Sequence, residues 1–308
     1  MINKINELKG MSFGPDLIGI APASRFDKDD PIFKILPETK SVICLAYRIL
    51  RGTHRGIEEG TSYHHYTTMA IEVLEETVMP MMALRCARVL EEEGYIALPQ
   101  KKTQTIMQED DSTNHEMLYN KIYRGKTAEY QMNYELSAAK CGLGEIGLSG
   151  TLLTEDYGPL QRYCFVLTDA ELPATPEFKA HICDKCEKCI KACPGNAIHD
   201  SKKEPWQCAA YYAGANMSKN PFMSQNAFPN RTDRLEILKG EKQLSSTEAR
   251  EVINEISYYP PIMHSYISSI CGNACDRACF IHLEEKGALN KKFENKFRKR
   301  EEWVLDVK

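Results

Sequence analysis

Four cysteines stand close together in the run Cys183-Asp-Lys-Cys186-Glu-Lys-Cys189-Ile-Lys-Ala-Cys193-Pro194. This is a C-x2-C-x2-C-x3-C-P pattern, in which three thiolates reach three irons of one cubane and the fourth is carried toward another cluster. Proline after the last cysteine turns the chain and tends to open a helix. The alternatives are a zinc site or disulfides, but zinc usually takes two C-x2-C pairs separated by a longer loop. The spacing therefore predicts an iron–sulfur site.

Two cubanes need eight thiolates, and four further cysteines lie downstream of this run. The crossover seen in two-cluster ferredoxins predicts one [4Fe–4S] cluster on Cys183, Cys186, Cys189 and Cys279. It predicts a second on Cys193, Cys208, Cys271 and Cys275. The second run departs from the pattern, because it reads C-x3-C-x3-C and no proline follows it, so its cluster is [4Fe–4S] or [3Fe–4S]. The long insertion between Cys208 and Cys271 could cover a cluster or frame a substrate channel.

The chain of 308 residues is long enough for a sizeable core and two domains. A hydrophobic content of 43%, a charged content of 27% and a net charge of −4 describe an ordinary soluble protein and argue against a whole-chain nucleic-acid binder. The first residues lack the apolar region of a secretory signal, and no stretch approaches the roughly 18 apolar residues of a membrane span. We therefore expect a cytoplasmic protein whose cysteines bind metal.

Three short apolar runs predict buried strands, over Leu17–Pro22, Ser41–Tyr47 and Arg162–Thr168. Residues 66–94 have helical periodicity, and Pro80 should kink or split that helix. Residues 99–127 are polar and aperiodic, which predicts a long loop with a short helix around 114–123. Residues 129–141 regain helical character.

A glycine-rich stretch follows Cys141 and includes Gly142-x-Gly144-x-x-Gly147. This spacing satisfies the dinucleotide fingerprint, but the fingerprint needs a preceding strand, and the residues before it look helical. We therefore do not expect a nicotinamide site. Glycines at this density still let a flat ligand or another backbone come close. Cys141 borders this loop. It and the three other remaining cysteines, which are Cys44, Cys86 and Cys164, are expected to be small buried hydrophobic side chains.

Taken together, the chain resembles the epoxyqueuosine reductases and the related reductive dehalogenases over roughly residues 10–285. Glu145, Tyr157-Gly158-Pro159 and Arg162 lean toward the dehalogenases. The other matching segments, in chain order, are Leu17-Ile-Gly-Ile-Ala-Pro-Ala23, Ile35-Leu-Pro-x-x-x-Ser-Val-Ile43, Ser62-Tyr-His64, Ala138-Ala-Lys-Cys-Gly-Leu-Gly-Glu-Ile-Gly147, Leu152-Leu-Thr-x-x-Tyr-Gly-Pro159 and Leu167-Thr-Asp-x-x-Leu-Pro173.

The resemblance implies an α/β (α+β) fold, in which a nitroreductase-like domain that holds base-off cobalamin, a corrinoid, is followed by a ferredoxin-like double-cubane domain. We place the first domain at residues 1–175, the second at 176–285 with an insertion at about 212–268, and a charged tail at 286–308. The resemblance also implies corrinoid contacts from Gly142, Leu143, Gly144, Gly147, Tyr157, Gly158 and Arg162.

A proton donor is less obvious. Epoxyqueuosine reductases carry an aspartate roughly a dozen residues before the Gly-Leu-Gly stretch, and here that position falls on Ala128-Glu129-Tyr130. Glu129 or Tyr130 could donate instead, because a pocket can raise the pKa of a carboxylate and the dehalogenase relatives use a tyrosine. The alternative is that both are ordinary residues at the start of a helix. His64 and His65 either line the pocket, as the Tyr-His motif implies, or are polar residues at the start of a helix.

The tail carries seven basic residues between Lys286 and Arg300, with acids at both ends. We expect a solvated helix face there, although a basic patch could bind tRNA phosphates or an acidic electron donor such as ferredoxin or flavodoxin. The main hypothesis is a corrinoid-dependent iron–sulfur reductase acting on a small molecule or on tRNA. An electron-transfer protein that reduces a partner's corrinoid, and a flavin in the nitroreductase-like pocket, are the alternatives. The oligomeric state stays open.

Overall fold

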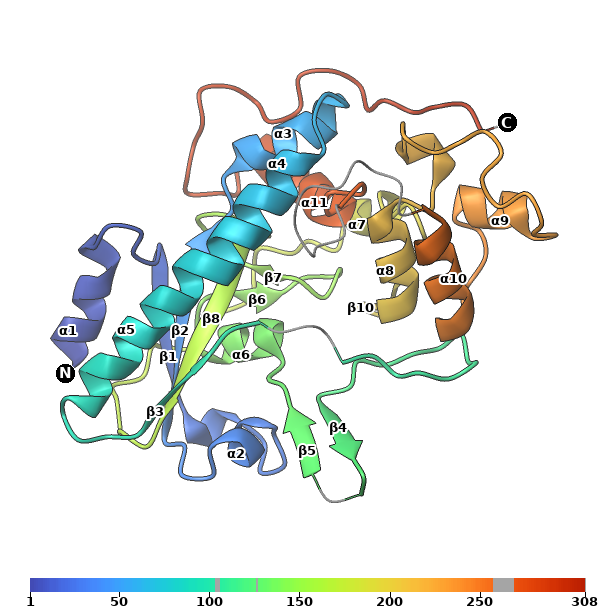
Figure 1. Ribbon diagram of the computed structural model, residues 1–308. Coiled ribbons are helices and arrows are strands. Elements are labelled where there is room, and N and C mark those ends of the chain that lie inside the picture. The colour runs from blue at the N-terminus through green and yellow to red at the C-terminus, as the bar shows by residue number, and fades with distance from the viewer. Residues whose placement is uncertain (103–105, 126, 257–268, 308) are drawn as a thin grey trace.

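The computed structural model describes residues 1–102, 106–125, 127–256 and 269–307 (Figure 1). A four-stranded antiparallel sheet has the order β1-β2-β8-β3. Its strands are β1 (Leu17–Pro22), β2 (Ser41–Arg48), β8 (Gln161–Thr168) and β3 (Ala97–Gln100). The three predicted strands are therefore confirmed, and the mixed fold of helices and sheet agrees with the expected class.

Alternation along β2 gives the sheet two buried faces, because successive side chains of a strand point to opposite sides. Ile43 and Leu45 belong to the core under α5 (Met79–Glu91) and α1 (Ile2–Glu7). Val42 and Cys44 belong to the opposite core, with α6 (Tyr134–Lys140) and α2 (Ile32–Ile35). Short 3-10 turns, η1 (Leu8–Gly10) and η2 (Ala23–Arg25), flank β1.

The predicted long helix is present in three pieces. α4 (His64–Tyr66) leads into a π-helical segment, η3 (Thr67–Val78), which continues as α5. Pro80 is the second residue of α5 and follows the π-helical segment directly, so its missing N–H removes one bond of the continuous helix. The expected split occurs there as a change from π-helix to α-helix. α3 (Arg51–Glu59) precedes these pieces and ends at Gly60, whose φ of +68° suits glycine.

The short helix expected around 114–123 is wrong. β4 (Asn120–Tyr123) and β5 (Thr127–Tyr130) form an antiparallel hairpin instead, which projects from the body of the protein (Figure 1). Arg124 and Gly125 both have positive φ, the backbone geometry of hairpin turns, and this signal outweighs the weak helical pattern. Because residues 127–130 belong to β5, the helix predicted from residue 129 begins only at Tyr134.

The remaining elements surround the cysteines of the second half. They are β6 (Glu145–Ile146), β7 (Leu152–Leu153), α7 (Lys188–Lys191), β9 (Ile198–His199), β10 (Lys202–Lys203), α8 (Pro205–Ala213), η4 (Met217–Lys219), α9 (Arg234–Lys239), α10 (Ser246–Ile256) and α11 (Ala274–Lys286). Side chains of α8, α9 and α10 share one apolar core. The last part of the predicted insertion, 257–268, lies outside the described residues.

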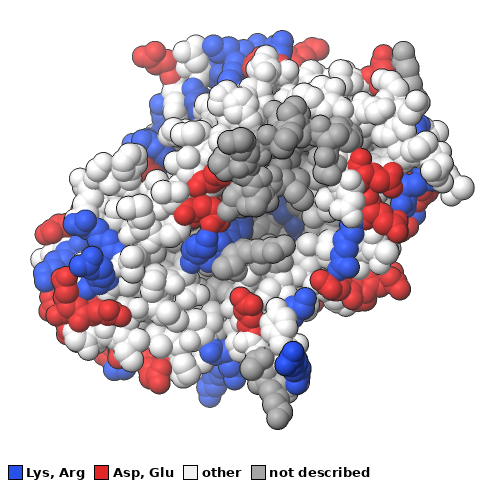
Figure 2. Space-filling view, in the orientation of Figure 1, with Lys and Arg blue, Asp and Glu red and all other residues white. Residues whose placement is uncertain are grey.

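Residues 287–307, here called the C-terminal strap, run across α3 without helix or strand (Figure 1). The solvated helix face expected for 286–300 is therefore wrong, because α11 ends at Lys286 and Gly287 caps it with a φ of +70°. Arg298 pairs with the buried Glu58, and Trp303 Nε1 donates to the carbonyl of Ile57 at 3.1 Å. Figure 2 shows basic side chains along this upper edge with acidic ones at both ends.

Candidate metal centres

Three cysteines of one loop and a fourth from a distant part of the sequence line one cavity with about 360 Å³ of space free of protein atoms. They are Cys183, Cys186, Cys189 and Cys279, the four predicted to share a cluster, and they are called the first thiol set. Gly147, Leu153, Glu187, His282 and Leu283 complete much of the lining. Three soft thiolates on one loop, with a fourth from another element, match the donors of an iron–sulfur cubane.

The loop of the first thiol set is held in a curled shape. Lys185 and Glu187 have φ values of +57° and +59°, so the chain turns back on itself between successive cysteines. The carboxylate of Glu145 accepts hydrogen bonds from the backbone N–H groups of Ile182 and Cys183, the latter at 2.7 Å. Glu145 thereby fixes the start of the loop, a role that the sequence did not reveal.

A second cavity, with about 400 Å³ of space free of protein atoms, is lined by Cys193, Cys208, Cys271 and Cys275. These are the four cysteines predicted for the other cluster, and they are called the second thiol set. Two backbone N–H groups point at its sulfurs: Ala197 N to Cys193 Sγ at 3.2 Å, and Ala274 N to Cys271 Sγ at 3.4 Å. Hydrogen bonds to cluster sulfurs are one of the factors that set the potential of such sites.

Helix α11 contributes to both sets. Cys275 lines the second cavity, and Cys279, one turn later, lines the first. Four residues of α-helix rise about 6 Å, so the two cavities are close neighbours along this helix. Cys189 of the first set and Cys193 of the second are likewise four residues apart, in and just after α7. The chain therefore crosses between the sets at Cys193 and again at Cys279.

The described part of the insertion packs against α8 and against the turn that follows Cys193. Gln207, beside Cys208 on α8, is fully buried and donates to the carbonyls of Gly195 and Lys242 at 2.7 and 2.8 Å. Its carbonyl oxygen accepts from Leu244 N at 2.9 Å. One amide thus ties together α8, the turn after Pro194 and the chain leading into α10. A Cβ at Gly195 would lie 2.1 Å from the ring of Tyr211, so only glycine fits this turn.

Burial governs the protonation of the second thiol set. It raises the pKa of Cys208 to about 12 and also raises the pKa of Cys271. Both groups are therefore thiols at neutral pH in the metal-free protein. Metals bind cysteine as thiolate, so loading this site must release protons.

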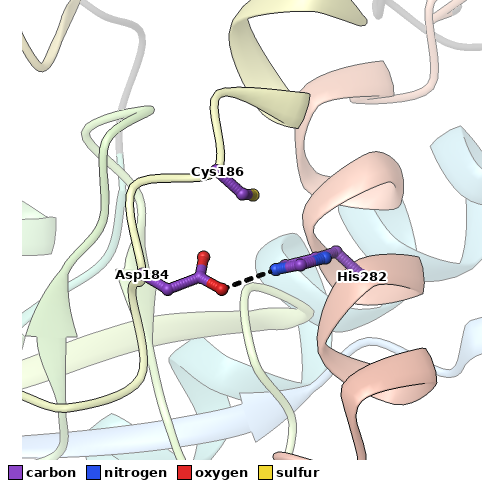
Figure 3. A group of neighbouring side chains, drawn as sticks. All are labelled: Asp184, Cys186 and His282. Atoms are coloured by element: carbon purple, nitrogen blue, oxygen red, sulfur yellow. Dashed lines mark hydrogen bonds and ion pairs between the residues drawn. The ribbon is translucent and has the colours of Figure 1, made fainter.

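Asp184 and His282 face each other beside the sulfur of Cys186 (Figure 3). His282 Nε2 and Asp184 Oδ2 are 2.9 Å apart, and Lys286 Nζ donates to the same oxygen at 2.6 Å. The hydrogen bonds from Lys286 and His282 hold the pKa of Asp184 well below its usual value. With its charge satisfied in this way, Asp184 borders the exposed side of the first thiol set.

The residues expected to contact a corrinoid are packed against the protein itself. A Cβ at Gly142 would lie 2.3 Å from the carbonyl oxygen of Pro176, and one at Gly144 would lie 1.9 Å from that of Leu153. Gly147 meets the Leu153 side chain, and Gly158 meets Leu283 of α11. These glycines therefore admit another part of the chain, one of the two possibilities that their density suggested. They do not form an open cradle that fits a flat cofactor.

The other residues predicted to contact a corrinoid also interact with neighbouring parts of the protein. The Arg162 guanidinium pairs with Glu75 of η3 and donates to the hydroxyl of Tyr66. The hydroxyl of Tyr157 lies 3.5 Å from Asp16. Leu143 is partly buried and packs against the core that contains Cys141.

The three candidate catalytic residues are not brought together. Glu129 is exposed and Tyr130 partly buried on the β4–β5 hairpin, whereas His64 is exposed at the start of α4, on the opposite side of the molecule (Figure 1). Ser62 Oγ lies 2.7 Å from His65 Nδ1 and 3.4 Å from His64 Nδ1. Their catalytic roles stay predictions.

The four cysteines outside the two sets are buried, as expected. Cys44, Cys86, Cys141 and Cys164 have no exposed surface, and Cys141 Sγ donates to the carbonyl of Val42 at 3.4 Å. Burial raises the pKa of Cys141 to about 12. None of the described helices is both long enough and apolar enough to cross a membrane.

No protein-family model matches the chain. It is 37% identical over 92 residues to a tetrachloroethene reductive dehalogenase of Desulfitobacterium hafniense, a match covering 28% of this chain and 15% of the relative. It is 38% identical over 61 residues to an epoxyqueuosine reductase of a Synechococcus strain, covering 20% of this chain and 19% of the relative. The matched segments thus span less than a fifth of either relative.

Solved structures of the same two groups align with most of the chain. One is an epoxyqueuosine reductase from Streptococcus thermophilus, at 12% identity and a TM-score of 0.43, covering 93% of this chain and 81% of the other. Another is a catabolic reductive dehalogenase, at 14% identity and 0.47, covering 89% and 34%. With TM-scores below 0.5, neither alignment establishes a common fold. The sequence matches confirm the predicted resemblance to the epoxyqueuosine reductase and reductive dehalogenase group.

Proposed function

We propose that the protein is an iron–sulfur oxidoreductase that carries electrons through two [4Fe–4S] clusters, one on each thiol set. The observation that carries this proposal is the sorting of eight cysteines into two cavities of four, with Cys193 and Cys279 crossing between them. A bound cluster would supply one-electron transfer. The chain's own residues would hold each cluster by four sulfurs, and at the second site backbone N–H groups would donate to two of them.

The first thiol set is the better entry point for electrons. Three cysteines of each set are partly exposed, but the loop of the first set also presents two exposed lysines, Lys185 and Lys188. We infer that a low-potential donor such as ferredoxin or flavodoxin meets this face. The second thiol set would pass electrons onward. In this proposal residues 176–285 form the ferredoxin-like unit and residues 1–175 the nitroreductase-like unit.

Two candidate functions differ in the group that accepts electrons from the clusters. The resemblance favours a reductase that uses cobalamin and acts on a small molecule or on tRNA. The packing of Gly142 and Gly144 against backbone favours the second candidate, an electron-transfer protein that reduces a corrinoid held by a partner. The exposed position of Glu129, away from both cavities, favours it as well. Pairing of Arg298 and Arg300 with Glu58 and Glu59 also leaves fewer free charges for tRNA.

Metal analysis of one anaerobically reconstituted preparation tests whether the two clusters are present and which of the two candidate functions is right. The proposal expects eight irons per chain and two reducible clusters in the electron paramagnetic resonance spectrum. Tightly bound cobalt after incubation with cobalamin would support the reductase. Reduction of a partner's corrinoid without cobalt uptake would support the electron-transfer protein. Zinc in place of iron, or fewer than four irons per chain, would contradict the proposed function itself.

A further inference from the structure

One lysine stands among the thiols of the second set. Lys203, the last residue of the β9–β10 hairpin, lines the second cavity together with Cys193, Cys208, Cys271 and Cys275. Its Nζ donates to Thr151 Oγ1 at 2.9 Å and lies 3.8 Å from Asp276 Oδ1. Among the residues described as lining the two cavities, Lys203 is the single lysine or arginine.

The β9–β10 hairpin directs the side chain of Lys203 toward the second cavity. Asp200 and Ser201 have φ values of +48° and +63°, so the chain reverses tightly between Ile198–His199 and Lys202–Lys203. Alternation along β10 then separates the two lysines. Lys202 points outward, with 75% of its side chain exposed, and pairs with the equally exposed Glu116 at 3.3 Å. Lys203 points inward, with 30% of its side chain exposed.

Asp276 is the negative counterpart. Its side chain is 4% exposed and accepts from Thr151 Oγ1 at 3.1 Å and from Asn273 Nδ2 at 3.0 Å. It lies behind Cys275, with Oδ1 at 3.6 Å from that sulfur, and is not among the residues lining the cavity. The next charged residue of α11, Arg277, pairs with the buried Glu58, which it shares with Arg298. Lys203 and Asp276 are therefore opposite fixed charges at unequal depth from one cavity.

Building on the proposed function, we propose that Lys203 and Asp276 form a charge pair that tunes the cluster on the second thiol set. Lys203 raises its reduction potential and Asp276 lowers it. Reduction adds one electron, and thus one negative charge, to a cluster already surrounded by four thiolates. A cation facing the cavity stabilises that added charge, and a carboxylate beside a ligand sulfur opposes it. Lys203 gives the second cluster a higher potential than it would have with thiolates alone, which favours electron flow from the first thiol set to the second.

Lys203 and Asp276 would act on the cluster through their charges, since neither side chain is a predicted ligand. Its signature is a pair of opposite shifts. Replacing Lys203 by Gln should lower the midpoint potential of the second cluster, and replacing Asp276 by Asn should raise it. Looser packing around the cluster would move both variants in the same direction, so the opposite signs separate a charge effect from a structural one.

The test uses the anaerobically reconstituted full chain, with redox titrations followed by electron paramagnetic resonance. We expect Lys203→Gln to lower the reduced-to-oxidised ratio of the second cluster at least tenfold at a fixed potential, equivalent to about 59 mV for a one-electron couple. Asp276→Asn should shift the ratio in the opposite direction. Lys203→Arg, which keeps the charge, should stay near the wild type. Lys202→Gln, the exposed neighbour, is the matched control and should not move either potential.

Iron analysis of each sample distinguishes a failure of the proposed function from a failure of the tuning role. If the wild type holds no clusters, the proposed function fails. If every variant holds eight irons and the second cluster keeps its potential in Lys203→Gln, the tuning role fails while the proposed function stands. Shifts of the same sign in Lys203→Gln and Asp276→Asn would also overturn the charge pair.

Discussion

The two thiol sets have the same donors and share α11, yet their surroundings differ. Each set has three partly exposed cysteines and one buried cysteine, but the first set is bordered by Asp184, to which both His282 and Lys286 are hydrogen-bonded. The second set is lined in part by α8 and has Lys203 in its lining. Net charge, hydrogen bonds and exposure are what distinguish clusters with identical ligands. The difference lies in the charged side chains near each set: a carboxylate with its own hydrogen-bonding partners beside the first, and a lysine in the lining of the second.

Replacing one cysteine of each set tests most directly whether the two sets hold separate clusters. Cys279→Ser should remove the cluster of the first set and Cys275→Ser that of the second, although the two residues are one turn apart on α11. We expect each variant to retain about half of the iron, and electron paramagnetic resonance should show that different clusters remain. Cys86→Ala, at a buried cysteine outside both sets, is the control. Loss of the same spectral species in both serine variants would contradict the crossover.

The metal-free protein should lose stability in alkali because of the second set. The folded state raises the pKa of Cys208 from about 9 to about 12, so the folded chain holds a proton that the unfolded chain releases. The free energy of unfolding is therefore unaffected by this thiol below pH 9 and falls as the pH rises toward 12.

Urea titrations between those pH values test this contribution. Cys208→Ala should have a slope against pH that is shallower by one proton, about 1.4 kcal/mol per pH unit. Identical slopes for the variant and the wild type would show that Cys208 is not held as a buried thiol.

Replacing Glu145 should weaken iron binding at the first set without affecting the second. Glu145→Ala leaves the N–H groups of Ile182 and Cys183 without their acceptor, at a cost of about 1.5–3 kcal/mol for a hydrogen bond to a charged group. Iron should then pass faster to a water-soluble chelator from the first set, with no change at the second. Glu145→Gln keeps an acceptor oxygen and should release iron at close to the wild-type rate. Equal acceleration at both sets would argue against a local role.

The smallest effect is expected at the surface pair beside the first set. Lys286→Ala removes the hydrogen bond to Asp184, but both side chains are substantially exposed, and such pairs contribute about 0.2–1 kcal/mol. Thermal unfolding of the loaded protein should change little, and less at high salt. A large loss of stability would mean that this face is buried in the functional protein, for example by a partner or a second copy.

The thiol sets could be predicted because ligand spacing is written locally in the chain. Three cysteines two residues apart can curl around one cubane wherever the rest of the protein lies, and the crossover rule then assigns Cys193 and Cys279. Lys203 could not be found in this way. Its position depends on a tight hairpin and on Asp276, which lies far along the sequence, and a lysine pair in a polar stretch resembles any solvated surface.

The errors in the fold have a similar origin. Continuous apolar runs predict the buried strands, because both faces of the sheet are covered. Periodicity misses the hairpin of β4 and β5, because its pairing depends on a turn at Arg124–Gly125 that a periodic pattern does not contain. The charges of the strap imitate a solvated helix face, because their partners Glu58 and Glu59 lie more than 200 residues earlier.

The strap also provides an optical probe. The chain has two tryptophans, and the structure places them in different surroundings. Trp206 on α8 is two residues from Cys208, whereas Trp303 on the strap packs against Gly60 and the edge of Tyr63. A coloured cluster quenches nearby indole emission by energy transfer. Light from Trp206 should therefore dim as the second site fills, while Trp303 reports whether the strap is still docked on α3. One fluorescence trace of each single-tryptophan variant would follow cofactor loading and strap release as separate events.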